Sequence, residues 1–270
     1  MKTHETLAQQ EFVAKQMKRR RMVTYTRILL LVLILVLWEF AARTGLINDF
    51  IFSSPSRIML TFASMVLDGS VFLHTGITIL EMLISFFLVT VIGIFGAVAL
   101  WSNKSLSEIL DPYLVMLNSL PKSALAPILI VWLGSNMRTI VVAAVSVAVF
   151  GSVLTLHNGF KSMDPDQMRL IYSLGGGKKD VLFKVLLPGS VPLIISNMKV
   201  NIGLCLVGVI IGEFLAARAG LGYLIIYGSQ VFKLDLVMMS IVILCVLSAL
   251  LYQGISILEK GAGGRTAKHS

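Results

Sequence analysis

The sequence predicts an all-α, polytopic membrane protein with six transmembrane helices. Hydrophobic residues make up 56% of the 270 residues and charged residues only 14%, whereas a soluble domain carries about 25% charged residues. A soluble fold of this size needs a charged exterior, so most of this chain must face lipid. The apolar residues also gather into runs close to the ~20 residues that cross a bilayer core.

Six apolar runs supply these helices in order. The run 28–42 is too long and too far from the N-terminus for a signal peptide, and no small-residue cleavage site follows it, so we expect a retained first helix. The run 109–133 contains Pro112, Pro121 and Pro127, which put this span at risk of a bend or break. The runs are approximately 28–42, 74–101, 109–133, 139–156, 191–217 and 236–258.

The distribution of basic residues predicts the orientation. Of 23 Lys and Arg residues, seven precede the first helix, one lies in 102–107, five lie in 161–184 and three lie in the tail, against five on the opposite side. By the positive-inside rule, both termini are cytoplasmic. The chain then divides into a basic N-terminal segment (1–24), a transmembrane domain (25–258) that includes the segment 160–188, and a cytoplasmic tail (259–270). Its Gly-rich end, 261–270, is expected to be disordered.

The basic segment 11–21 (EFVAKQMKRRR) has two interpretations. It is partly amphipathic, so it could form a surface helix that contacts anionic headgroups or a partner. Alternatively, its charges anchor the first helix in the positive-inside orientation. We favour the anchor and keep the surface helix as the alternative.

The reactive residues argue against an enzyme. Cys205 and Cys245 lie in apolar runs without CxxC or Cys/His spacing, and the four His residues are scattered. The gaps between runs contain no P-loop, no Ser/His/Asp set and no paired carboxylates with a His. The net charge of +9 does not indicate nucleic acid, because the basic residues lie between the spans. We expect no catalytic residue, no metal site and no cofactor bound by this chain.

Three charged residues, Glu81, Lys199 and Glu213, fall within apolar runs. A charge in lipid costs at least ~2.5–3.5 kcal/mol on insertion scales, so we expect these side chains to face the bundle interior and to pair. We favour a structural role for Glu213. Five glycines of the second and fifth runs are expected at close helix contacts: Gly93, Gly96, Gly203, Gly208 and Gly212.

The longest gap, 158–188, predicts a helix–glycine turn–helix at the cytoplasmic membrane face. Asp164 can cap a helix whose first residue is Pro165. Gly175–Gly177 end that helix. A second short helix starts at Lys178 and continues until Pro188 breaks it. The segment offers apolar and basic side chains to another molecule.

The spacing in this segment resembles the cytoplasmic signature of permease subunits of binding-protein-dependent ABC importers. That signature is Glu-Ala-Ala, three residues, Gly, nine residues and Ile-x-Leu-Pro; here Gly175 takes the glycine and 185–188 (VLLP) the end, with the spacing intact. Further fragments resemble the nitrate/sulfonate/taurine branch, which includes importers of thiamine precursors. They are SSPSRI (53–58), DP (111–112), SLPKSALAPILIVWLG (119–134), GE (212–213) and GLG (220–222).

The resemblance covers about 53–232 and implies a type I ABC importer permease fold. It implies a translocation path for a small solute: an anion such as sulfonate, nitrate or taurine, or a thiamine precursor. It also implies that 160–188 couples this chain to a separate ATPase subunit, which binds the ATP. The other implied partners are an extracytoplasmic binding protein, a second permease copy and lipid, in a bacterial plasma membrane. The implied coupling residues are Arg169, Leu170, Ile171, Leu174, Gly175, Leu187 and Pro188.

One position departs from the family signature. The Glu-Ala-Ala triplet is Arg169-Leu170-Ile171 here, so a basic residue replaces an acidic one. The reversed charge predicts an ATPase groove with compensating charge, for which a generic ATPase of the family would not substitute.

The third run brings prolines and polar residues together. Pro frees backbone carbonyls, which lipid tolerates only where they face protein or a watery cavity. We therefore favour a broken helix that lines the translocation path; the alternative is a packing kink with Lys122 snorkelling to the interface. The candidate path residues are Asn118, Ser119, Pro121, Lys122 and Ser123.

An ATP-independent secondary transporter is the alternative function, and an integral membrane enzyme is a third. A secondary transporter needs ion or relay sites near the midplane and often has inverted repeats, which the sequence does not indicate. An enzyme needs a cluster of His, Asp or Glu, but His74 and His157 are predicted near opposite membrane faces. Neither alternative has a use for the helix–glycine–helix segment.

Overall fold

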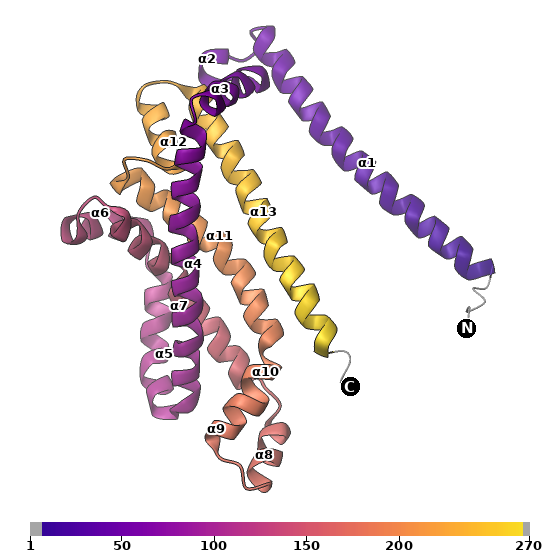
Figure 1. Cartoon of the computed structure of the whole chain (residues 1–270), viewed down its shortest axis with the longest axis vertical. Coiled ribbons are helices and arrows are strands. Elements are labelled where there is room, and N and C mark those ends of the chain that lie inside the picture. The colour runs from indigo at the N-terminus through magenta and orange to yellow at the C-terminus, as the bar shows by residue number, and fades with distance from the viewer. Residues whose placement is uncertain (1–6, 267–270) are drawn as a thin grey trace.

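The computed structural model describes the backbone of residues 7–266 and the side chains of 15–48 and 51–257, and every regular element within these ranges is a helix. This confirms the predicted all-α class (Figure 1). In chain order the elements are α1 (Leu7–Arg43), α2 (Asp49–Phe52), α3 (Pro55–Leu67), α4 (Ser70–Ser102), α5 (Lys104–Ser119), α6 (Lys122–Leu133), α7 (Met137–Lys161), α8 (Pro165–Ser173), α9 (Lys178–Val181), the π-helical turn η1 (Leu182–Leu186), α10 (Leu187–Gly189), α11 (Val191–Ala216), α12 (Leu221–Gln230) and α13 (Leu234–Thr266).

The membrane spans follow the predicted runs. Among the described helices, α1, α4, α7, α11 and α13 are long and apolar enough to cross a membrane, and the count of five becomes six if the pair α5–α6 is one span. That pair is bent by 93°. The break lies at Leu120 and Pro121, whereas Pro112 and Pro127 remain inside helices. The predicted break in the third run is therefore confirmed, and a single proline marks it.

The core of the bundle is formed by α4, α7 and α11. Half of the most apolar window of α7 is buried inside the chain. Apolar side chains of all three helices join one cluster, among them Met82, Ala144 and Val209, which are fully buried. Because lipid is as apolar as these side chains, the helices associate through close packing rather than through the hydrophobic effect.

Glycines make this close packing possible. A Cβ on Gly208 would lie 2.5 Å from the Cα of Ala144, and one on Gly212 would lie 3.0 Å from the Cα of Ile140, so α11 meets the backbone of α7 directly. Gly93 of α4 faces the Ser152 hydroxyl in the same way. The expectation was wrong at Gly203, which faces open space. Helical spacing shows that a glycine lies in a helix, but not which face it occupies.

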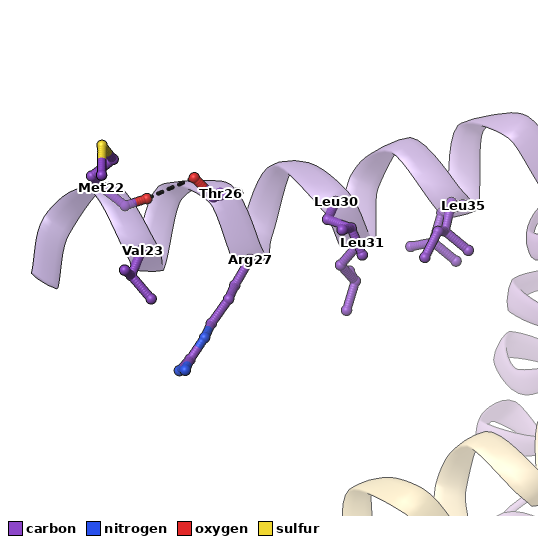
Figure 2. A pocket seen from close by; sticks show the side chains of 8 residues that line it. Met22, Val23, Thr26, Arg27, Leu30, Leu31 and Leu35 are labelled. Atoms are coloured by element: carbon purple, nitrogen blue, oxygen red, sulfur yellow. Dashed lines mark hydrogen bonds between the residues drawn. The ribbon is translucent and has the colours of Figure 1, made fainter. Parts of the chain in front are cut away.

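The first helix stands away from this core (Figure 1). Its apolar membrane window has no buried residue. The hollow drawn in Figure 2, lined by residues such as Arg27 and Leu30, is formed by α1 alone, so it is an open flank of one helix rather than an enclosed site. Near its C-terminal end, Glu39 accepts hydrogen bonds from the Ser56 N–H at 3.1 Å and the Ser56 hydroxyl at 2.9 Å, at the start of α3. A carboxylate is favourable there because a helix N-terminus is positively polarised.

Both ends of the chain run beyond the predicted spans as helix. The basic residues of 15–21 belong to α1 and are exposed, so they continue the first span instead of forming a separate surface helix. The last helix extends to Thr266, where the sequence predicts a disordered tail. In Figure 1, α1 and α13 both extend from the end of the bundle near α3 in the direction of the end that carries α8 and α9, and α1 diverges to one side.

The contrast between two glycines of α11 gives a stability test. Gly208→Ala forces a Cβ against the α7 backbone, and we expect it to lower the free energy of unfolding by ~1–3 kcal/mol. Gly203→Ala enters open space in the same helix and is expected to leave the melting temperature unchanged or to raise it, because Ala is the better helix former. Thermal unfolding of the two purified variants in one detergent decides this; equal melting temperatures would contradict the close contact.

Candidate functional site

The helix–glycine turn–helix begins as the sequence predicts. The Asp164 side chain caps α8 by accepting a hydrogen bond from the Asp166 N–H at 2.9 Å, and Pro165 occupies the first turn. The cap supplies an acceptor to N–H groups that have no partner within the helix, and proline needs none there.

Two glycines turn the chain after α8 for different reasons. Gly175 has a φ of +82°, in the left-handed region that residues with a Cβ rarely adopt. A Cβ on Gly176 would lie 2.9 Å from the carbonyl oxygen of Ile171, so this residue allows the chain to pass close to α8. The Gly177 N–H then donates to the Asp180 carboxylate at 2.9 Å, which starts α9.

The ion pair of Asp180 strengthens the start of α9. The Lys184 ammonium lies 2.7 Å from this carboxylate. The hydrogen bond from Lys184, followed by that from the Gly177 N–H, holds the pKa of Asp180 below its usual value. The stabilisation is present above the ordinary pKa of an aspartate and is lost as the pH falls through the lowered value.

The second half of the segment is fixed to the bundle. Val181 and Leu186 are fully buried. Leu186 packs in a small apolar cluster with Ala97 of α4 and with Leu156 and Phe160 of α7. The Lys178 ammonium donates to the Ser102 carbonyl at the end of α4 and lies 5.9 Å from the centre of the Trp101 ring. The second half of the segment is therefore in direct contact with α4 and α7.

Pro188 does not break the second helix, contrary to the expectation. The backbone passes through the π-helical turn η1 and continues as α10 to Gly189, with Pro188 in the first turn of α10. A proline normally clashes with the carbonyl four residues earlier, and the wider π-turn removes that conflict. Leu187 is half-buried and Pro188 is exposed.

The first half of the segment is exposed. None of the residues of α8 is buried, and the exposed fractions of Leu170, Leu174 and Phe183 are 59%, 76% and 66%. Met168 and Ile171 are half-buried. Exposed apolar side chains that lie close together are typical of a surface that contacts a protein partner or a membrane.

The charge of Arg169 has a neighbour within α8. Its guanidinium lies 3.1 Å from the Asp166 carboxylate, one turn earlier, and both side chains are exposed, at 78% and 81%. Exposed pairs of this kind contribute ~0–1 kcal/mol, so Arg169 can exchange this partner for one on another protein.

The candidate path residues surround the α5–α6 break, far from α8 (Figure 1). The Lys122 ammonium turns back and donates to the Asn118 carbonyl, one of the carbonyls left without a helical partner at the end of α5. The Asn118 side chain faces Gly151 of α7, where a Cβ would lie 3.2 Å from its oxygen. Asn118, Ser119, Pro121 and Ser123 are exposed, and Lys122 is partly exposed.

The structure shows polar contacts that sequence reasoning missed. The Ser107 hydroxyl lies 2.8 Å from Nε2 of the buried His157, and the Lys161 ammonium lies 3.2 Å from the Asp111 carboxylate, so the start of α5 is tied to the end of α7. The DP pair of the sequence was a signal for this contact, because its aspartate is the acceptor.

A second missed contact lies at the other end of the bundle. The Asp235 carboxylate of α13 accepts from the Ser53 hydroxyl at 2.7 Å and lies 3.1 Å from the Arg57 guanidinium of α3. The fragment SSPSRI contains both donors, but its partner lies too far along the chain for spacing to reveal it.

The three charged side chains of the apolar runs and the two cysteines lie outside the segment 160–188. Glu81 and Glu213 face each other inside the bundle, as the sequence predicts for buried charges. The Lys199 ammonium lies 5.6 Å from the centre of the Tyr252 ring. In the described part of the chain no three His, Cys, Asp or Glu side chains converge as metal ligands, and Cys205 and Cys245 are unbridged.

Comparison with known proteins gives consistent matches. Residues 89–262 match the family described as binding-protein-dependent transport system inner membrane component. The chain is 27% identical to a probable ABC transporter permease protein of Haemophilus influenzae, over 83% of this chain and 91% of that protein. It is 26% identical to a putative aliphatic sulfonates transport permease protein of Bacillus subtilis, over 93% and 91%.

A solved structure shares the fold. The inward-facing conformation of the MetNI methionine ABC transporter superposes with a TM-score of 0.61 at 18% identity, and the match covers 69% of this chain and 93% of that one. The type I importer permease fold expected from the sequence is therefore confirmed.

The glycine turn after α8 gives a local test. Valine at position 175 must leave the left-handed region, which costs ~1–2 kcal/mol or more, so we expect the α8 amides to exchange hydrogen on the order of tenfold faster in Gly175→Val. Gly177→Ala is the matched control, because Gly177 has an extended backbone and the nearest atom to an added Cβ is 3.9 Å away. Hydrogen exchange read by mass spectrometry measures both; identical rates in the two variants would contradict the assigned role of Gly175.

Proposed function

Because this chain belongs to the family of binding-protein-dependent transport system inner membrane components, we propose that it forms the path of an importer for a small anionic solute, driven by a separate ATPase that docks on 160–188. The observation that carries the proposal is the construction of that segment. Leu170 and Leu174, in and just after α8, are exposed, whereas Leu186 of η1 is buried against α4 and α7. A partner that grips α8 therefore acts on the core of the bundle.

The coupling residues divide into three groups. Arg169, Leu170 and Leu174 are exposed and supply the contact surface. Gly175 forms the turn, and Gly176 packs against Ile171 of α8. Leu187 and Pro188 join the segment to α11, next to the π-turn. In this arrangement ATP is bound by the partner subunit, and this chain is not an enzyme.

The path is proposed to pass the α5–α6 break. The exposed Asn118 and Ser123 offer amide and hydroxyl donors, and Lys122 adds a positive charge nearby. The hydroxyl of the exposed Ser119 donates to the Val115 carbonyl. Hydrogen-bond donors and a positive charge attract an anion, whereas a carboxylate at this place would repel it. The relative in Bacillus subtilis named for aliphatic sulfonates supports a sulfonate as the first solute to test; nitrate, taurine and thiamine precursors follow from the branch that the sequence resembles.

The functional unit is proposed to contain two copies of this chain, two ATPase subunits and an extracytoplasmic binding protein. The isolated α1 supports the pairing, since its membrane window is not buried by its own chain. A second copy is the occupant that would place α1 against protein, with lipid filling what remains.

The orientation is proposed from charge. The N-terminal part of α1, the turn before α5 and the segment 161–184 carry most of the basic residues and lie toward one end of the bundle (Figure 1). By the positive-inside rule, this distribution supports a cytoplasmic location for both termini and for the ATPase in a bacterial plasma membrane.

Co-purification from the native membrane tests the assembly. We expect the tagged chain in mild detergent to bring down a P-loop ATPase in equal amount, identified by mass spectrometry. Leu170→Asp combined with Leu174→Asp should reduce the recovered ATPase about tenfold or more, as loss of a buried interface anchor does. The matched control is Leu46→Asp. Leu46 is 74% exposed and follows the C-terminal end of α1, away from α8. A stable complex without an ATPase would contradict the proposal.

The reversed charge at position 169 gives a partner-specific test. If the ATPase groove compensates Arg169, Arg169→Glu should weaken binding of the native ATPase and improve binding of a family ATPase whose own permease carries Glu in the triplet. Arg169→Lys keeps the charge and is the control. Pull-down of both ATPases at several salt concentrations measures the effect, because salt screens exposed charges. Equal recovery of both ATPases by the wild-type chain would refute the charge match.

A further inference from the structure

Two carboxyl groups meet inside the bundle where α11 ends and α12 begins. Glu81 lies on α4 and Glu213 on α11, and their exposed fractions are 2% and 0%. The two carboxyl groups lie within hydrogen-bonding reach of each other. An ionised carboxylate can only accept hydrogen bonds, so a bond between two carboxyl groups requires a proton on one of them.

The surroundings of Glu213 are those of the ionised partner. Its Oε1 accepts from the Thr78 hydroxyl at 2.7 Å, and its Oε2 accepts from the Gly222 N–H at 2.5 Å. The Tyr223 N–H also donates to it. Three donors of this kind stabilise a negative charge that is removed from water.

Glycines make room for this carboxylate. A Cβ on Gly220 would lie 2.4 Å from the Glu213 Cδ, and one on Gly222 would lie 2.8 Å from its Oε2. The GLG fragment of the sequence thus forms a cradle around a single side chain. The same turn is fixed to α4, because the Leu221 N–H donates to the Thr78 hydroxyl at 2.8 Å and the Gly220 N–H donates to His74 Nδ1 at 3.0 Å.

Glu81 has the opposite surroundings. Its Oε2 is buried and has no hydrogen-bond partner, so no hydrogen bond stabilises a charge on that oxygen. An ionised Glu81 would bring a second negative charge against Glu213 at a site shielded from water, which is strongly unfavourable. A neutral acid avoids this cost and supplies the donor that Glu213 lacks.

We propose that Glu81 is a positioning residue that keeps its proton and donates it in a hydrogen bond to the ionised Glu213. The pair then carries one proton and one negative charge. It holds the turn between α11 and α12 against α4, at the end of the bundle opposite the coupling segment. Loss of the Glu81 proton would place two negative charges at this joint and release the turn.

The other titratable groups around the pair do not neutralise it. On α4, His74 accepts the Gly220 N–H and stacks on Tyr223 of α12 with ring centres 6.1 Å apart. On α7, Ile140 faces this part of α11, and Arg138, two residues earlier, is exposed. Arg218, in the turn between α11 and α12, is also exposed. On α13, Asp235 is engaged with Arg57 of α3.

Infrared spectroscopy of the purified transporter in its native complex tests the assignment. A protonated carboxylic acid has a carbonyl stretching band separate from those of carboxylates and amides. We expect this band to disappear in Glu81→Gln and to remain in Glu213→Gln and in the control Glu108→Gln, which replaces an exposed carboxylate. A band that survives Glu81→Gln, or that only Glu213→Gln removes, overturns the proposal.

The pH dependence of thermal unfolding provides a second readout. Because the proposed bond consists of the Glu81 proton held between the two carboxyl groups, the stability from this bond is lost when that proton leaves at high pH. We expect the melting temperature of the wild type to fall toward alkaline pH by several degrees more than that of Glu81→Gln, whose amide keeps the donor and has no proton to lose. Parallel curves, or a Glu81→Gln variant that does not fold, would contradict the assignment.

Discussion

Every backbone N–H and C=O inside a bilayer must find a partner within the protein, because lipid offers none. Continuous helices meet this requirement by themselves, so the informative places are those where a helix stops. At the end of α5 a lysine turns back to a freed carbonyl. At Pro188 the helix widens into a π-turn instead of breaking. At the end of α11 a carboxylate, a hydroxyl and an imidazole receive the N–H groups of the turn that follows. The free backbone groups at each interruption are therefore accommodated in a different way.

The α7 helix and its direct contacts with α11 link the two ends of the molecule. The α7 helix runs from the turn near Ser135, whose hydroxyl donates to the Ala216 carbonyl, to Lys161 beside the segment 160–188. It meets α11 without intervening side chains at Gly208 and Gly212. Two helices in backbone contact move as one body more readily than two helices separated by flexible side chains. The contact thus suits a protein in which an event at α8 must reach the α5–α6 break.

The sequence predicts local structure well and contacts across helices poorly. Apolar runs locate the spans, and Asp164 with Pro165 locates the start of α8, because those signals act within a few residues. The coupling and path residues stay predictions, since their partners are other molecules. The pairing of Glu81 with Glu213, the capping by Lys122 and the open face of Gly203 depend on how helices rotate against each other. No spacing rule within one run contains that rotation.

The isolation of α1 has a consequence for how this chain can vary. A core helix such as α7 must match the shape of its neighbours at each buried position, so most substitutions there create a cavity or a clash. The ten residues ILLLVLILVL of α1 are exposed and do not pack against a core formed by their own chain. Leu, Ile and Val can exchange along this stretch with little effect on the fold of the monomer. The C-terminal end of α1 is held by Glu39, which meets the start of α3, by Trp38, which packs against the core, and by the buried Ala42. This geometry permits the sequence to vary in the apolar part of α1 and requires it to stay constant at the C-terminal end of that helix.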